Sequence, residues 1–539
     1  MKKIFINIYK LLLILTISNF IPAHATPIDV SSPRPVVPPN VITTSNRPMI
    51  MLAASKDHSL FGPIYTDFED LDGDGVIDTT FIPTFKYYGY FDATKCYSYV
   101  NSEFEPVALA TANTGIKSVT TNGVISTIAT TQYTCGSDSA TTKWWSGNFL
   151  NWSTMSRLDI VRKMLYGGRR STDSNGTTVL ELSKLNYDAH SFVKYYNGTD
   201  IRSYTPFTTT DLTKTTGVNV TTTTVGGTTT KTGIYAGLSI CITGSSDNST
   251  TSPNPPIMKM VKGNVRLWGT VELEVCRWHD TNSYSRGTFG PKLARYYQNA
   301  DKGNGIISHE ITIPTVSADG ATYSASGSVG PELTLRLKVC DPNFLGEEHC
   351  QAFPPDSTSN YKPYGLFQEF GFSASGAARS EFGVITGSYD KNYTAGALRK
   401  NMGDFADEIN PTTGVFCHSA SSGCLANLAS PDNRPTGNGA IKAFDAIILN
   451  DRRADTYGTQ GIPSTVAEGS LSSWGNPIGE MLVQALQYYA YNGTTPTPTN
   501  PSSTSKDSSV GMPELPGAIR FPMLPVPENP YTETQYADH

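Results

Sequence analysis

The stretch Met49-Ile-Met-Leu-Ala-Ala54 decides the predicted fold, because it is a short apolar run with the length of a buried strand. Far along the chain, Asn476 and Pro477 predict the start of a helix, since asparagine caps helix N-termini and proline suits the first turn. Apolar residues follow at helical spacing, namely Ile478, Met481, Leu482, Ala485, Leu486 and Tyr489. This strand and helix, separated by sequence rich in β-forming residues, predict a fold between α/β and α+β with large β-rich insertions.

Between these two elements, the pattern predicts mainly β-structure and one further helix. The apolar positions of that helix recur every three or four residues, at Phe149, Trp152, Leu158, Val161 and Leu165. We expect it to end at Gly167-Gly168, with 157–170 as its exposed basic face and end. Strands are predicted within 82–99, 263–278 and 333–339, a hairpin within 105–142, and a Thr-rich insertion across about 203–256.

The first 25 residues have the pattern of a secretory signal peptide. Lys2, Lys3 and Lys10 form a basic region, Leu11–Ile17 is apolar, and Ala23-His24-Ala25 is a small-residue cleavage site. A membrane anchor is the alternative, but the apolar run is too short to cross a bilayer. We therefore expect an exported protein with no membrane span in the mature chain, beginning with a Pro/Ser-rich leader at 26–47.

Composition excludes several classes of protein. The chain has 539 residues, of which 38% are hydrophobic and only 16% are charged, with a formal net charge of −6. That charge becomes −9 once the three lysines of the predicted signal peptide are removed. A coiled coil, a basic nucleic-acid binder and an acidic disordered chain are all excluded by these values.

Export makes disulfide bonds the expected state of the eight cysteines. The pairs nearest in sequence are Cys96/Cys135, Cys241/Cys276, Cys340/Cys350 and Cys417/Cys424, although 105 connectivities are formally possible. Zinc binding is the competing interpretation, because His349 adjoins Cys350 and His418 adjoins Cys417. No C-x-x-C spacing supports it.

The strongest chemical signal is the acidic segment from Asp70 to Asp78. Carboxylates stand at positions 1, 3, 5 and 9 of a loop that has Gly75 at position 6, a spacing that suits a hard cation such as Ca²⁺. The predicted ligands are Asp70, Asp72, Asp74, the carbonyl of Val76, and Asp78. Position 12 is Phe81 and not glutamate, so this is a calcium loop outside an EF-hand. Its expected role is structural, because millimolar external calcium fills weak sites that order a loop.

Enzyme signatures are lacking in the sequence. His309-Glu310 does not continue into H-E-x-x-H, and there is no G-x-S-x-G or P-loop motif. A non-enzymatic protein is therefore expected. The alternative is a secreted hydrolase or carbohydrate-active protein with a structural calcium loop, in which Trp144, Trp145 and Trp278 would form a sugar-stacking platform.

Taken together, several segments resemble the N-terminal region of PilY/PilC-type type IV pilus tip-associated adhesins and assembly proteins. Their order along residues 48–492 carries the resemblance more than any single motif does. Besides the acidic loop, the segments are Lys56-Asp57-His58, Tyr88-Gly-Tyr-Phe91, Cys96-Tyr-Ser-Tyr99, Trp145–Trp152, Arg157-Leu-Asp159, Arg162–Gly168, Tyr364–Phe367, Arg379–Gly387, Leu398–Asn401, Glu408-Ile-Asn410 and Asn476–Glu480.

The resemblance implies export through the periplasm to the outer membrane or cell surface and the pilus tip. It implies minor and major pilins as partners, together with host or abiotic surfaces. It also implies a von Willebrand factor A-like domain, here in degenerate form. The D-x-S-x-S motif of a metal-dependent adhesion site is replaced by Ser55-Lys56-Asp57-His58, and Asn476 stands where that site has threonine.

The expected organisation has one principal region at 48–493 and a Thr/Pro-rich linker or tail at 494–539. The β-propeller of the resembled family is not expected in this chain. A truncated remnant of a longer pilus protein is therefore a further alternative.

Overall fold

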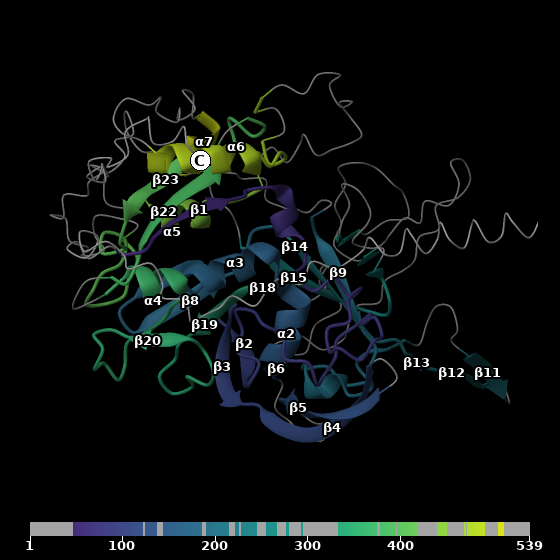
Figure 1. Cartoon of the computed structure of the whole chain (residues 1–539). Coiled ribbons are helices and arrows are strands. Elements are labelled where there is room, and N and C mark those ends of the chain that lie inside the picture. Colours follow the sequence, from purple (N-terminus) through teal and green to yellow (C-terminus); the bar gives the residue numbers. More distant parts are fainter. Residues whose placement is uncertain are drawn as a thin grey trace, which may run out of the picture. The chain divides into compact units, whose positions relative to one another are not determined.

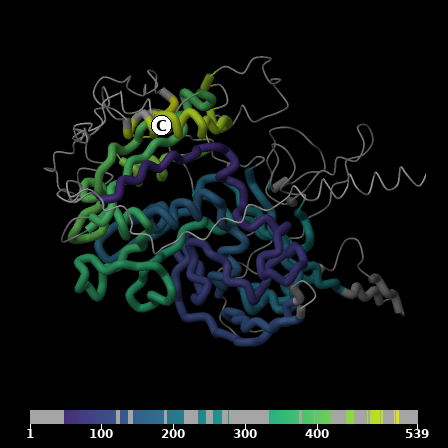
Figure 2. The backbone as a smooth tube through the Cα atoms, in the orientation of Figure 1, coloured from purple at the N-terminus to yellow at the C-terminus, as the bar shows by residue number. Residues whose placement is uncertain are grey.

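The computed structural model describes residues between 47 and 512 and is drawn in Figures 1 and 2. The predicted signal peptide, nearly all of the leader and most of the tail lie outside the described residues. Within 47–512, the residues left undescribed are 122–123, 137–143, 186–189, 215–220, 226–227, 245–254, 267–275, 277, 280–292, 295–331, 374–377, 395, 418–438, 450–467, 470–471, 491–504 and 511.

The predicted first strand is confirmed as β1 (Met49–Ala54). It pairs in parallel with β22 (Glu381–Gly387), which in turn pairs antiparallel with β23 (Gly396–Gly403). Figure 2 shows the purple β1 beside the green β22 and β23, although they lie far apart in the sequence. No described strand pairs with the other edge of β1, so its residues remain partly exposed.

Helices lie on both faces of this three-stranded sheet (Figure 1). The predicted late helix is confirmed as α6 (Ile478–Ala490), and the amide of Met481 donates to the carbonyl of Pro477 in its first turn. Met481, Ala485 and Tyr488 pack against Ile385, Leu398 and Met402. On the other face, α5 (Ala440–Asp445) contacts β22 and β23.

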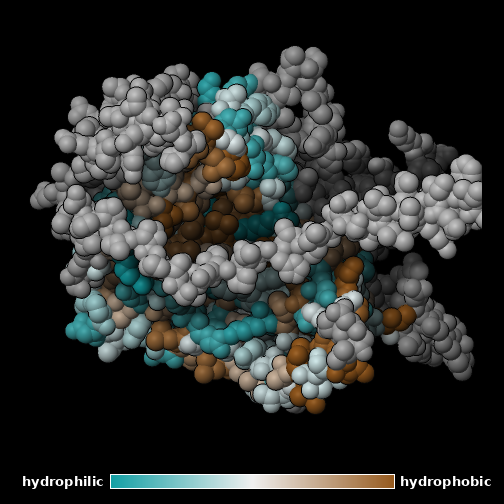
Figure 3. Space-filling model, viewed as in Figure 1, coloured by the Kyte–Doolittle hydropathy of each residue, from teal (hydrophilic) through white to brown (hydrophobic). Residues whose placement is uncertain are grey.

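The predicted apolar face of α6 is only partly buried. Leu482 and Leu486 remain 52% and 68% exposed, because the described sheet is narrow and the helix lies over its open edge. Figure 3 shows the resulting apolar surface at the position of α6.

A larger β-rich part lies between β1 and β22 in sequence. It contains a six-stranded mixed sheet of β6 (Trp145–Ser146), β2 (Lys95–Val100), β3 (Glu103–Leu109), β19 (Arg336–Val339), β8 (Thr177–Glu181) and β7 (Arg170–Ser174). A four-stranded antiparallel sheet follows the order β18 (Glu332–Thr334), β15 (Ile257–Lys262), β14 (Leu238–Thr243) and β9 (Phe192–Tyr196). The single strand predicted at 333–339 is therefore two short strands, one in each sheet.

The remaining described elements are short or project from these sheets. The predicted hairpin is confirmed as β4 (Thr111–Thr121) paired with β5 (Val124–Thr134). The Thr-rich insertion contributes β10 (Thr213–Lys214), β11 (Thr221–Val225), β12 (Thr228–Thr232) and β13 (Ile234–Tyr235). The others are β16 (Trp278–His279), β17 (Leu293–Ala294), β20 (Cys350–Ala352), β21 (Tyr361–Pro363), α4 (Leu366–Gly371), α7 (Ser505–Ser509) and the 3₁₀ turns His58–Phe61 and Ile201–Ser203.

Two of the predicted strand regions differ from the structure. Only β2 forms within 82–99, while Tyr87, Tyr90 and Phe91 are buried in the irregular segment before it. Phe81 stands at the centre of this aromatic core, with ring contacts to Tyr87, Phe149, Trp152, Tyr196 and Tyr204. Of the strand predicted at 263–278, residues 267–275 lie outside the described residues, and β15 ends before it begins.

The single helix predicted around Trp152 is wrong, because the chain forms two helices there. The first, α2 (Gly147–Thr154), ends at Met155, whose backbone is extended, and α3 (Arg157–Tyr166) begins after Ser156. Ser156 and Asp159 exchange hydrogen bonds as a capping box, which starts a new helix in the middle of the apolar pattern. Gly167 ends α3 with a φ of 87°, as the predicted stop requires.

The prediction that the basic residues of 157–170 are exposed is wrong at Arg162. Arg162 is 1% exposed, and its guanidinium donates to the carbonyls of Phe444 and Ile447 at 2.8 and 3.0 Å. It also donates to Ser183 Oγ at 3.0 Å. Arg162 therefore ties α3 to the end of α5.

The fold is thus mixed α/β, mostly sheet with few helices, and the described residues contain no propeller. None of the described helices has the length and apolar character needed to cross a membrane.

Candidate calcium loop and aromatic cleft

The segment from Asp70 to Asp78 forms a closed, tightly turned loop. An antiparallel bridge joins Glu69 to Asp78, with the amide of Asp78 donating to the carbonyl of Glu69 at 2.9 Å. Gly73 and Gly75 have φ values of 73° and 85°, a left-handed conformation that a Cβ would strain. Gly75, at position 6 of the loop, therefore makes the sharp turn that the sequence pattern predicts.

Three of the four predicted carboxylates converge. Asp70, Asp72 and Asp78 each place one oxygen within 4.8 Å of the others. Asp70 also accepts hydrogen bonds from the amides of Asp74 and Gly75, at 3.0 and 2.8 Å, which folds the loop around its first carboxylate. Asp78 accepts from the amide of Leu71 at 2.8 Å.

The other two predicted ligands lie differently. Asp74 is outside the converging group, and its carboxylate accepts from the amide of Val76 at 2.8 Å. The side chain of Val76 is 64% exposed, and the role of its carbonyl stays a prediction.

Asp72 provides the clearest sign that the loop suits a cation. Its side chain is only 8% exposed, and its Oδ1 has no hydrogen-bond donor. A buried carboxylate oxygen without a partner is unfavourable, and a divalent cation among the three carboxylates would satisfy it. Burial and the three neighbouring aspartates raise the pKa of Asp78, a further mark of crowded negative charge.

Lys117 is a residue of this site that sequence reasoning missed. It lies on β4, yet its ammonium group pairs with Asp72 Oδ2 and, at 2.7 Å, with Asp74 Oδ2. Its hydrogen bond lowers the pKa of Asp74, and the two carboxylates raise the pKa of Lys117. No local signal could have revealed it, because the contact depends on how hairpin β4–β5 lies.

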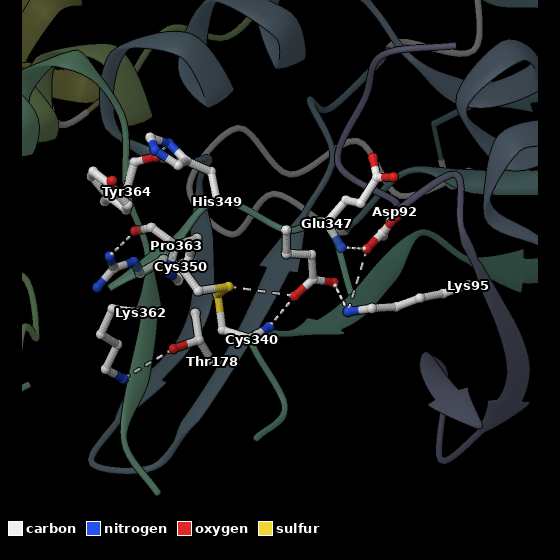
Figure 4. The surroundings of a disulfide bond; sticks show 12 residues. Asp92, Lys95, Thr178, Cys340, Glu347, His349, Cys350, Lys362, Pro363 and Tyr364 are labelled. Carbon is white, nitrogen blue, oxygen red and sulfur yellow. Dashed lines mark hydrogen bonds and ion pairs between the residues drawn. A yellow bond between two sulfur atoms is a disulfide. The ribbon is translucent and has the colours of Figure 1, made fainter. Parts of the chain in front are cut away.

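Three of the predicted disulfides are confirmed, namely Cys96–Cys135, Cys241–Cys276 and Cys340–Cys350. Cys417 is also disulfide-bonded, while Cys424 and His418 lie outside the described residues. The zinc interpretation is wrong at Cys340 and Cys350, because bonded sulfurs cannot act as thiolate ligands. Lys95 forms a buried ion pair with Glu348, and the ring of His349 stacks on Tyr364 with centroids 3.7 Å apart. Figure 4 shows Lys95, His349 and Tyr364 around the Cys340–Cys350 bond.

A cleft of about 220 Å³ opens beside this disulfide, and its walls include Tyr88, Tyr364, Lys163 and Glu369. Lys163 donates to the carbonyl of Gly89, and its ammonium lies 4.4 Å from the centre of the Tyr88 ring. Burial lowers the pKa of Lys163 to about 8. No sequence pattern indicates this cleft, because its walls come from distant segments.

The tryptophan platform expected for a carbohydrate-active protein does not form as predicted. Trp145 is fully buried, where it contacts Phe104 and Phe207. The side chain of Trp278 lies outside what the structure describes.

A buried cation lies just after β1, in the segment that the resemblance to A domains places at a metal-dependent adhesion site. Lys56 is 1% exposed, and its ammonium donates to the carbonyl of Ser472 and lies 5.0 Å from the centre of the Tyr389 ring. A positive charge there disfavours a metal ion. The absence of a metal-dependent adhesion site stays a prediction.

Comparison with known proteins places these features in a family. A family model described as "PilY1 homolog, small alpha/beta domain" matches residues 78–238, and one described as "PilY1 homolog, second domain" matches residues 382–520. No solved structure matches the chain, so the A-domain-like scaffold stays a prediction.

Two proteins of Xylella fastidiosa strain Temecula1, both named type IV pilus biogenesis factor PilY1 homolog, are similar in sequence. One is 29% identical over 472 residues, which cover 85% of this chain and 25% of that protein. The other is 34% identical over 108 residues, covering 19% of this chain and 7% of that protein. The chain therefore spans about a quarter of the length of the first of these relatives. The two domain models in sequence order and the long alignment show that the chain belongs to the PilY1-type family.

Proposed function

We propose that this chain is an exported, non-enzymatic type IV pilus biogenesis protein that acts in pilus assembly and surface attachment. The alignment over 85% of the chain with a protein named as a pilus biogenesis factor supports the pilus part of the proposal. The expected partners are minor and major pilins and the surfaces to which pili attach. The expected location runs from the periplasm to the cell surface and the pilus tip.

The second part of the proposal is that Ca²⁺ binds the Asp70–Asp78 loop and stabilises the fold. The observation that carries it is the buried Asp72 Oδ1, which has no donor although two further carboxylates lie within 4.8 Å. Oxygen-only ligands favour calcium over zinc or copper. The loop precedes Phe81 at the centre of the aromatic core, so ordering the loop also secures that core.

The pilus role is tested in a deletion strain of the source bacterium. Loss of pili or of attachment, restored by the wild-type gene, is the expected result. Normal piliation and attachment in the deletion strain would refute it. Complementation with Asp72→Asn then asks whether the loop is needed, and partial restoration is expected because the loop stabilises rather than reacts.

A carbohydrate-binding role is the second candidate, and the cleft beside Cys340–Cys350 favours it. Aromatic rings such as Tyr88 and Tyr364 can stack on sugar rings, and Lys163 and Glu369 supply polar contacts. Binding on a glycan array that Tyr88→Ala abolishes would favour this role. The matched control is Tyr133→Ala, on hairpin β4–β5 and outside the cleft lining.

A further inference from the structure

Hairpin β4–β5 has few attachments to the rest of the described chain. Its base is secured by the disulfide Cys96–Cys135. Residues 111–116 and 125–129 are exposed, and Ile116 and Ile125 are 80% and 73% exposed. On the described distal part of β4, only Lys117 and Val119 are covered, and these alternate residues lie on one face of the strand.

Lys117 is a polar attachment of the distal part of this arm, in addition to the hydrogen bond from Gln132 to Tyr204 nearer the base. Its ammonium pairs with Asp72 Oδ2 and Asp74 Oδ2, two carboxylates of the loop proposed to bind calcium. It neutralises one unit of the four negative charges there and leaves Asp72 Oδ1 without a donor. The ammonium group of Lys117 therefore compensates only part of the negative charge of the loop.

The ammonium group and a calcium ion would use the same carboxylate, because Lys117 contacts Oδ2 of Asp72 and the ion would bind its Oδ1. Calcium lies 2.3–2.6 Å from each of six to eight oxygens, so an ion bound to Asp72 would meet the Lys117 charge at close range. Two cations in contact repel strongly when little water screens them. Binding of one therefore weakens binding of the other, and by linkage the effect is reciprocal.

We propose that Lys117 is a built-in competitor for the calcium loop, so that Ca²⁺ binding displaces Lys117 and frees hairpin β4–β5 from the loop. This inference rests on the calcium role proposed above. Calcium would then have two effects, ordering the loop while exposing the inner face of the arm. That face carries Lys117 and Val119, together with Ile128, which pairs directly with Lys117.

The first test measures calcium affinity by isothermal titration calorimetry with CaCl₂ and chelator-treated protein. Lys117→Met should bind Ca²⁺ more tightly than the wild type, by a factor on the order of 10, because no charge must be displaced. The matched control is Lys86→Met, which removes a lysine that pairs with Glu347, not with a carboxylate of the loop, and lies over the Tyr133 ring. Lys86→Met should leave the calcium affinity unchanged.

The second test follows the arm by hydrogen–deuterium exchange of peptides covering 111–121. In the wild type, CaCl₂ should increase exchange around Lys117 while decreasing it in 70–78. In Lys117→Met, exchange of the arm should already be high without calcium and should not rise further. Asp72→Asn should abolish the calcium response of both segments.

The possible outcomes separate the two proposals. If neither the wild type nor Lys117→Met binds Ca²⁺, the calcium role itself is wrong. If both bind with equal affinity, or if calcium leaves exchange of the arm unchanged in the wild type, the calcium role stands and the competition by Lys117 is refuted. Tighter binding by Lys117→Met together with a freed arm supports the inference.

Discussion

The Asp70–Asp78 loop and the buried network of Asp159, Ser183 and Arg162 are two charged regions that differ in how fully their polar atoms are bonded. Asp159 is buried and accepts four hydrogen bonds from Ser156 and Ser183, and Ser183 also accepts from Arg162. In the loop, by contrast, four carboxylates share one lysine, and Asp72 Oδ1 has no donor. The comparison teaches that a buried charge with every bond made is structural, whereas an excess of one charge with an unsatisfied atom indicates a place for a ligand.

The largest expected effect is the loss of Arg162. Arg162→Met should lower the free energy of unfolding by about 3–5 kcal/mol, because Ser183 Oγ and the carbonyls of Phe444 and Ile447 would lose a buried donor and Asp159 would lose a nearby positive charge. Denaturant unfolding measures the change. Arg157→Met, on the exposed side of the same helix, is the control and should cost less than about 1 kcal/mol. Equal costs would mean that the buried hydrogen bonds of Arg162 do not contribute to the stability of the fold.

Calcium is expected to have the next largest effect. At a free concentration about 100 times the dissociation constant, Ca²⁺ should stabilise the protein by about 2.7 kcal/mol through binding only the folded state. Thermal unfolding with CaCl₂ or with a chelator measures this, and Asp72→Asn should abolish the difference. The same melting temperature in both conditions would mean that the loop is an unfilled acidic turn.

Sequence patterns predicted the loop but not its partner, and the reason is distance along the chain. The carboxylates of 70–78 are neighbours in sequence, so their convergence follows from local turn geometry, as do β1, hairpin β4–β5 and the start of α6. Lys117 and Arg162 act on groups that only the tertiary fold brings near. The helical spacing of apolar residues around Trp152 continues across Ser156, so it did not reveal that one helix ends there and another begins. The capping box of Ser156 and Asp159 marks this break. Burial of Arg162 follows from the position of α5, which no pattern near Arg162 reveals.

Lys163 belongs to neither of the two regions compared above, and its effect on the free energy of unfolding should depend on pH. Burial lowers its pKa to about 8 from an ordinary value of 10.5, so the folded state releases this proton before the unfolded state does. Its charge therefore destabilises the fold fully below pH 8, and the penalty fades as the pH rises from 8 toward 10.5. The difference in unfolding free energy between the wild type and Lys163→Met should shift in favour of the wild type over that range. A difference that stays constant with pH would show that Lys163 keeps an ordinary pKa.

The smallest effect is expected where a charge pair is neither buried nor in excess. The side chains of Lys86 and Glu347 are 47% and 54% exposed, so water already solvates both groups and salt screens their attraction. Lys86→Met should change the free energy of unfolding by less than about 0.5 kcal/mol in denaturant unfolding. A change as large as that of Arg162→Met would mean that pairing alone governs stability. A negligible change would mean that burial and charge imbalance, and not contact alone, determine the effect of a charged site on stability. Lys86 and Glu347 are in contact, but their side chains are neither buried nor in excess of one charge.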